Sequence, residues 1–440
     1  MLTDQLKSMA DFKPFQAWRY QPSKIRLDDV IAPPYDVISP TAQEKLYRRS
    51  PQNCVRLILN QEKNTDHESD NRYTRSRDFL ETWCREGVLV KDEEPSFYLY
   101  EQVFIDPRDG REKRRMSLLG RIKLEPFERD IIIPHEKTLA KPRADRARLL
   151  ETTHTNFSPV FGLYEDPEGK TRLLYEEVRR GSPAVEAKDD EGAQHRLWQV
   201  SRRDLIESLR ELFRSKKIYI ADGHHRYQTA LEHALRERKR FSTEDERPSD
   251  FVLMALVEFH DPGLVLLPTH RLMTSLPEAS DAKLVDALRP FFKIDPLSKE
   301  EIFKRLETKD AGKSPQFGLF FEKEQFLLTL GDLSKAKTKM PAGKPSVWYD
   351  LDVNVLGHLI LASLWQLAEP EWENYLRFTQ SSEEAVSAVR QKTVRASLLL
   401  RALRPEVLRE MGEVRELMPQ KSTYFYPKLA SGLVFYRHTA

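Results

Sequence analysis

An almost uninterrupted apolar run, Phe251 to Phe259, constrains the fold of this chain more than any other segment. A strand of this composition has no polar face, so both of its faces are expected to be buried. The shorter run Ile218 to Ala221 has the same character, and a helical pattern from Tyr227 to Arg240 lies between the two. This alternation predicts a mixed α/β (α+β) fold in which helices cover a sheet.

The length of the chain favours several domains. A chain of 440 residues exceeds what one compact core holds. We expect an N-terminal α+β domain over residues 12–125, a central domain over 126–290 and a C-terminal α+β region over 291–440. Within the first, the strand patterns Phe97 to Ile105 and Met116 to Leu124 predict a hairpin.

The composition of the chain limits the cellular compartment and the binding partners that we expect for it. The 71 basic and 69 acidic residues give a net charge of +2, so no overall field attracts nucleic acid or a membrane surface. No apolar run reaches the ~20 residues that span a bilayer, and the first residues do not resemble a secretory signal. Cys54 and Cys84 have neither metal nor redox spacing. We therefore expect a cytoplasmic protein without a membrane partner.

The turn Asp222-Gly223-His224-His225-Arg226 is the strongest candidate for a site. A strand that runs into a helix start presents backbone amides and the positive end of the helix dipole. Gly223 allows a ligand to approach the backbone, and Arg226 is a forked, permanent cation. The pattern indicates a phosphate-binding turn, although it matches neither a P-loop nor a dinucleotide motif. The alternative is a buried turn with hydrogen-bonded histidines.

A second candidate is the pair His135-Glu136, which follows the apolar run Ile131 to Ile133 and Pro134. A carboxylate at the end of a buried strand can have a raised pKa and act as a general base. The alternative is that Glu136 only complements the dipole of a following helix.

Three further groups are weaker candidates. A run of cations could neutralise a polyphosphate, but a solvated helix face is favoured; its members are Lys137, Lys141, Arg143 and Arg146. Asn156 and Ser158 could contact a substrate, or could simply stabilise their own turn. The tail Lys421 to Lys428 could close over a ligand, but an aromatic strand packed on a core is the favoured interpretation. The charged segment Glu165 to Gln194 is expected to be an exposed insertion.

A resident metal is not expected. Histidines and carboxylates occur in both candidate groups, but no HExxH spacing or cysteine ligand accompanies them. Mg²⁺ that arrives with a nucleotide is easier to accommodate, because it needs few protein ligands.

Five ordered motifs resemble those of a widespread prokaryotic family, domain of unknown function 1015, from about Phe12 to the C-terminus. They are Ala32 to Ser39, His135-Glu136, Asn156 to Pro159, Ala221 to Tyr227 and Lys421 to Lys428. The role of the first and the last of these motifs is left open.

The turn Gly223 to Tyr227 also resembles the phosphate-binding box of the ParB/sulfiredoxin superfamily. Its free-serine kinases carry Asp-Gly-His-His-Arg preceded by His-Glu, and this chain has both elements in that order. The resemblance implies a ParB/sulfiredoxin-like nucleotide-binding core, with ATP or ADP and Mg²⁺ as cofactors. His224 stands where sulfiredoxins carry their cysteine, so reductase chemistry has no nucleophile here. DNA binding like that of partition proteins is disfavoured by the nearly neutral charge.

The function expected from these motifs is nucleotide-dependent phosphoryl transfer to a small hydroxyl compound, with free L-serine the most concrete acceptor and a role in serine metabolism implied. Glu136, Asp222 and His225 form the predicted catalytic set, in which Glu136 accepts the hydroxyl proton and Asp222 orients a metal or a phosphate-bound water. The predicted phosphate-binding residues are Gly223, His224, His225 and Arg226. The predicted substrate-binding residues are His135, Asn156 and Ser158.

Two other functions stay open. One is a nucleotide-binding sensor or scaffold with little catalysis, and the less favoured one is a ParB-like DNA-associated protein. The apolar helix pattern Leu351 to Leu367 indicates a core or subunit-contact helix, so a homo-oligomer is left open as well.

Overall fold

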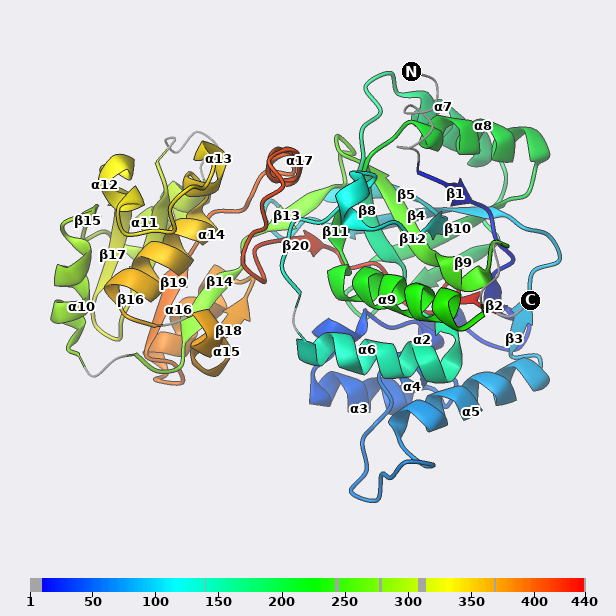
Figure 1. Cartoon of the computed structure of the whole chain (residues 1–440). Helices are drawn as coiled ribbons and strands as arrows, with labels where there is room; N and C mark the ends of the chain where they lie inside the picture. Colours follow the sequence, from blue (N-terminus) through cyan, green and yellow to red (C-terminus); the bar gives the residue numbers. More distant parts are fainter. Residues whose placement is uncertain are drawn as a thin grey trace. The chain divides into compact units, whose positions relative to one another are not determined.

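A computed structural model describes residues 10–138, 140–241, 245–276, 279–307, 314–367 and 369–438 (Figure 1). The chain divides into two compact units. The first unit comprises the described residues up to Pro134, those of Thr138–Val265, and those from Pro427 onward. The second comprises His135–Lys137 and the described residues of Leu266–Tyr426.

The first unit is built on one mixed sheet. Its strand order is β6-β11-β8-β12-β5-β4-β10-β9, and β1 pairs with β5 beside this path. The pairs β6–β11 and β8–β12 are parallel, and the other pairs are antiparallel. The strands are β1 (Phe12–Lys13), β4 (Phe97–Ile105), β5 (Glu112–Lys123), β6 (Ile132–Ile133), β8 (Val160–Tyr164), β9 (Val185–Lys188), β10 (Gln194–Val200), β11 (Ile218–Asp222) and β12 (Phe251–Glu258).

This sheet confirms the predicted α/β class and the hairpin, which is β4 and β5. Strand β12 is apolar except at its last residue, Glu258, and lies between β8 and β5, as its composition requires. Because β4 and β5 pair with β10 and β12, the first two predicted domains share one sheet. The three predicted domain ranges stay a prediction, since the compact units divide the chain differently.

Helices pack on this sheet through periodic apolar positions. In α8 the buried residues Leu205, Leu209 and Phe213 recur every four positions and form one face. In the view of Figure 1, α7 and α8 lie above the sheet and α9 lies below it. The helices of the first unit are α2 (Leu27–Val30), α3 (Pro40–Arg49), α4 (Val55–Ile58), α5 (Arg72–Arg85), α6 (Ala140–Thr153), α7 (Lys170–Val178), α8 (Arg203–Arg214) and α9 (His224–Phe241).

Short elements complete this unit. Three one-turn 3-10 helices are η1 (Tyr35–Val37), η2 (Phe127–Arg129) and η3 (Pro248–Asp250). Outside the main sheet, β2 (Trp18–Tyr20) pairs with β3 (Leu89–Lys91), and β7 (Thr155–Asn156) pairs with β21 (Tyr436–Arg437). The C-terminal segment is therefore part of the first unit.

Two sequence expectations for this unit are corrected. The segment Glu165 to Gln194 is more than an exposed insertion, because it contains α7 and the edge strand β9, whose Val185 and Ala187 are buried. Helix α9 begins at His224 rather than Tyr227. The polar start of this helix reads as a turn in the sequence, but Gly223 supplies the helix cap.

The second unit contains an antiparallel sheet in the order β15-β17-β16-β19-β14-β18. Its strands are β14 (His270–Met273), β15 (Phe292–Asp295), β16 (Gln316–Phe320), β17 (Gln325–Leu330), β18 (Leu376–Thr379) and β19 (Ala396–Leu399). Two short strands, β13 (Val265–Leu267) and β20 (Tyr424–Tyr426), form a separate pair.

Helices bury the apolar side chains of the second unit. The predicted helix Leu351 to Leu367 is present as α14 (Asp352–Asn354) continued by the π-helical segment η4 (Val355–Leu364), and most of η4 is buried. The others are α10 (Asp281–Leu288), α11 (Lys299–Glu307), α12 (Leu333–Lys337), α13 (Ser346–Tyr349), η5 (Glu369–Glu371), α15 (Trp372–Tyr375), α16 (Ser382–Arg390) and α17 (Glu406–Glu413). Among the described helices, none combines the length and the apolar composition that crossing a bilayer requires.

The buried His270 makes the stability of the second unit depend on pH. Its Nδ1 accepts a hydrogen bond from the Leu400 amide at 3.1 Å, and its Nε2 lies 3.0 Å from the Ser382 hydroxyl. Burial, with a smaller contribution from Arg271, lowers the pKa of His270 from 6.5 to about 4. The unfolded chain therefore takes up a proton at a higher pH than the folded chain, so the stabilisation is present above pH 6.5 and is lost as the pH falls towards 4.

We expect His270 to account for about 2–3 kcal/mol of the fall in the free energy of unfolding over this interval. Urea unfolding followed from pH 6.5 to 4 measures the fall, and His270→Asn should reduce it. The control His67→Asn, which replaces an exposed histidine, should leave it unchanged. An equal fall in wild type and His270→Asn would contradict the prediction.

Candidate functional site

The turn predicted to bind phosphate lies between β11 and α9. The register of β11 against β8 shifts between Ile220 and Asp222, so β11 has an irregularity of the β-bulge type at its end. Such irregularities redirect side chains and are frequent beside active sites. Gly223 has φ +91, which favours glycine, and its carbonyl accepts the Tyr227 amide at 2.9 Å. The chain thus turns sharply from strand into helix.

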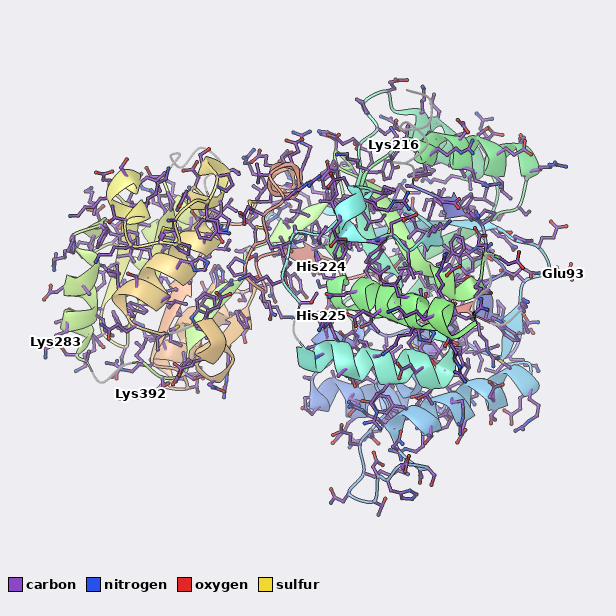
Figure 2. The ribbon with its side chains drawn as sticks, viewed as in Figure 1. Glu93, Lys216, His224, His225, Lys283 and Lys392 are labelled. Carbon is purple, nitrogen blue, oxygen red and sulfur yellow. The ribbon has the colours of Figure 1, made fainter. Side chains whose placement is uncertain are left out.

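The two histidines lie in the first turn of α9 (Figure 2). His224 is buried, with 7% of its surface exposed, and His225 is half-buried. The first-turn amides of a helix point beyond its N-terminus and carry the positive end of the dipole. The first turn of α9 therefore has a geometry that favours an anion, and phosphate binding at this turn stays a prediction.

Arg226 covers this turn. Its guanidinium donates a hydrogen bond to the Pro159 carbonyl and lies 3.9 Å from the Asp222 carboxylate. A Cβ at position 223 would lie 3.0 Å from the guanidinium atoms, so only glycine leaves this arrangement undisturbed. Arg226 consequently links the turn to the Asn156 to Pro159 motif.

A cavity beside Arg226 brings together residues from three of the sequence motifs. It has a volume of about 50 Å³, and every residue that lines it belongs to the first unit. Its polar lining is Tyr35, Arg146, Thr155, Asn156, Ser158, Arg226 and Thr229. Its apolar lining is Ile58, Leu149, Leu150, Phe157 and Val252. The cavity thus combines two guanidinium groups with an apolar wall.

Arg146 corrects the expectation of a solvated cationic face, since only 8% of its surface is exposed. It donates to the Ile58 carbonyl at 2.8 Å and pairs with Asp145. Its guanidinium carbon lies 3.8 Å from the centre of the Tyr35 ring. Burial raises the pKa of Tyr35 to about 12, although the positive charges of Arg146 and Arg226 oppose the shift. Tyr35 therefore stays protonated and keeps a hydroxyl donor at this cavity.

Asn156 and Ser158 line the same cavity, and both also stabilise the surrounding structure. The side-chain Oδ1 of Asn156 accepts a hydrogen bond from the Leu253 amide at 3.0 Å, and the Ser158 hydroxyl lies 2.6 Å from that of Ser431. Both alternatives raised by the sequence are thus compatible with their position.

The sequence did not single out Lys428 as an individual site residue, although it lies at the end of the predicted tail motif. Its ammonium is 3.0 Å from the Asp222 carboxylate, and the other carboxylate oxygen of Asp222 accepts the Gly223 amide at 2.8 Å. The mixture of cations and hydroxyls in the tail was the available signal. This mixture of residues gave no indication that Asp222 is the partner of Lys428.

His135 and Glu136 belong to the second unit, whereas the turn belongs to the first. The Glu136 carboxylate accepts the Lys421 amide at 3.1 Å, and the buried His135 ring lies 3.0 Å from the Thr423 hydroxyl. The beginning of the tail thus fixes both residues. Their joint action with Asp222 stays a prediction, as do the catalytic roles of Asp222 and His225.

No group of three or more His, Cys, Asp or Glu side chains in the described part of the chain could hold a metal ion. The two guanidinium groups that line the cavity favour an anion.

Comparison with known proteins gives one family and several distant structures. The sequence model of a family described as "Protein of unknown function (DUF1015)" matches residues 12–354 and ends before the tail, which the sequence motifs had included. Among curated proteins, none is significantly similar to the chain.

Three solved structures are distantly similar to this chain. A conserved hypothetical protein from Pyrococcus furiosus is 13% identical, with 70% of this chain and 91% of that chain covered and a TM-score of 0.33. A free serine kinase in complex with AMP is 12% identical, with coverages of 69% and 86% and a TM-score of 0.34. SbnI with a C-terminal truncation, from Staphylococcus aureus, is 9% identical, with coverages of 72% and 86% and a TM-score of 0.35. Likenesses at these scores do not establish a shared activity.

Proposed function

We propose a function for this chain, which belongs to the DUF1015 family, a family whose description leaves the function open. The proposed function is to bind a nucleotide through its phosphates and to transfer a phosphoryl group to a small hydroxyl compound. One observation carries the proposal. Separate sequence motifs supply Tyr35, Asn156, Ser158 and Arg226 to one cavity, where Arg146 adds a second guanidinium. Two guanidiniums beside a helix N-terminus favour a polyanion.

The chemistry proposed needs positioning and charge neutralisation more than covalent catalysis. An acceptor hydroxyl oxygen forms a bond to the terminal phosphorus of ATP or ADP, and the bond from that phosphorus to the departing nucleotide breaks. Gly223, His224, His225 and Arg226 would hold the phosphates. Glu136 is the proposed acceptor of the hydroxyl proton, on the sequence argument alone, and free L-serine is the first acceptor to test.

The test uses the full chain with ATP or ADP, Mg²⁺ and a panel of small hydroxyl compounds that includes L-serine, followed by ³¹P NMR. We expect a phosphorylated product with at least one acceptor. Glu136→Gln should lower its rate about 100-fold or more, which is typical for removal of a general base, with nucleotide affinity changed less than about twofold. Glu128→Gln, at an exposed glutamate, is the matched control.

Equal turnover by wild type and Glu136→Gln would reject Glu136 as the base. Tight nucleotide binding without any product would favour the sensor function instead. Absence of nucleotide binding would reject the proposal.

A further inference from the structure

Lys428, the last residue of the tail, is fixed by several hydrogen bonds to its side chain and its backbone. Lys428 donates to Asp222 within the first unit, and only 11% of its side chain is exposed. Its own carbonyl accepts a hydrogen bond from the Gln102 side chain at 3.0 Å. The preceding carbonyl, of Pro427, accepts one from Arg115. Side chains from β4 and β5 therefore fix the backbone carbonyl groups of both Pro427 and Lys428.

These two supporting side chains are themselves buried and joined. Arg115 and Gln102 are each 1% exposed, and Arg115 also donates a hydrogen bond to the side-chain Oε1 of Gln102. Burial lowers the pKa of Arg115 to about 10, which reflects the cost of removing its charge from water. A surface ion pair between flexible side chains needs no such support. Buried groups that fix a backbone segment are typical of residues whose position matters for a ligand.

The same segment reaches the other motifs of the site. Ser431 exchanges backbone hydrogen bonds with Ala32, at 2.8 and 3.1 Å, and its hydroxyl lies 2.6 Å from that of Ser158. The residues from Lys428 to Ser431 thus join the segments that carry Tyr35 and Ser158 to the turn at Asp222. Lys428 lies beside the proposed phosphate-binding residues, next to the carboxylate that precedes Gly223.

We propose that Lys428 is a phosphate-binding residue of this site, with Arg115 and Gln102 as its positioning residues. An ammonium group has three donors, so it can contact Asp222 and a phosphate oxygen at the same time. Asp222 then orients the lysine and moderates the positive charge that Lys428, Arg226 and Arg146 place here. The inference rests on the proposed function, since it assigns a residue to the same nucleotide.

The experiment compares binding of ADP and of adenosine by the full chain in isothermal titration calorimetry. Lys428→Met should weaken ADP binding about 10- to 100-fold, as expected for loss of a charge-assisted hydrogen bond, and change adenosine binding less than about twofold. Lys428→Arg should retain more of the ADP affinity than Lys428→Met. Lys63→Met, at an exposed lysine of the first unit, is the matched control.

A double variant separates ligand binding from a structural ion pair. Asp222→Asn with Lys428→Met removes both charges, so its melting temperature should lie closer to wild type than that of Lys428→Met, while its ADP affinity stays weak. Restored ADP affinity in the double variant would overturn the inference, as would unchanged ADP affinity in Lys428→Met when wild type binds ADP. If wild type itself binds no ADP, the proposed function fails, and the role of Lys428 fails with it.

Discussion

Replacement of Arg226 by methionine is expected to weaken nucleotide binding about 100-fold or more, which corresponds to about 3 kcal/mol. The guanidinium has two tasks, because it donates to the Pro159 carbonyl and also lines the cavity. Removal of the charge takes away a proposed phosphate partner, and it also releases the motif that carries Asn156 and Ser158.

Arg226→Lys should recover little of this affinity. An ammonium on a flexible stem cannot reproduce the planar fork that contacts Pro159 and still presents donors to the cavity. Titration with ADP measures the effect. Arg236→Met provides the control, because Arg236 lies on the same helix, is exposed and pairs with Glu151. If Arg226→Met and Arg236→Met bind ADP equally well, the cavity is not the nucleotide site.

Gly263→Ala is expected to lower the free energy of unfolding by about 3 kcal/mol or more, through overpacking against a rigid backbone. A Cβ at this position would overlap the carbonyl oxygen of Arg114 and lie 2.5 Å from the amide nitrogen of Arg115. Both atoms belong to β5, which at these positions pairs with Val103 and Gln102 of β4, whereas its pairing with β12 begins at Leu118. The overlap is with backbone atoms, so the strand or the turn that carries Gly263 has to shift.

Gly110→Ala is the matched control for this substitution. Gly110 has φ +70, but a Cβ there would have nothing within 4 Å, so only the backbone preference of about 1 kcal/mol is at stake. Urea unfolding of the two variants compares the costs. Equal costs would mean that the strand adapts to the added methyl group.

The sequence predicted the parts of the fold that depend on local pattern. The apolar runs at Ile218 and Phe251 became neighbours of β8 in a helix-covered sheet. The start of α9 was wrong by three residues. Its first residues are polar and follow a glycine, and such a composition is equally typical of a turn.

Contacts between residues that are far apart in the sequence could not be predicted from local sequence patterns. Arg146 looks like a solvated cation until Tyr35 and the Ile58 carbonyl are known to surround it. Lys428 is separated from Asp222 by 206 positions, and local pattern contains no information about such a pair. The sharing of one sheet by two predicted domains was missed for the same reason, because strand pairing is decided by the tertiary structure.

The first unit is built from segments that lie before and after the second unit in the sequence, and this affects the order in which the two units can fold during translation. Strand β21 pairs with β7, so the unit that begins near the N-terminus lacks a strand until Tyr436 and Arg437 have left the ribosome. Nearly all of the second unit, by contrast, lies in one continuous stretch that is translated earlier. Domains generally fold as they emerge during translation, and the order here is reversed. The second unit can therefore fold before Tyr436 and Arg437, which complete the first unit, have been synthesised.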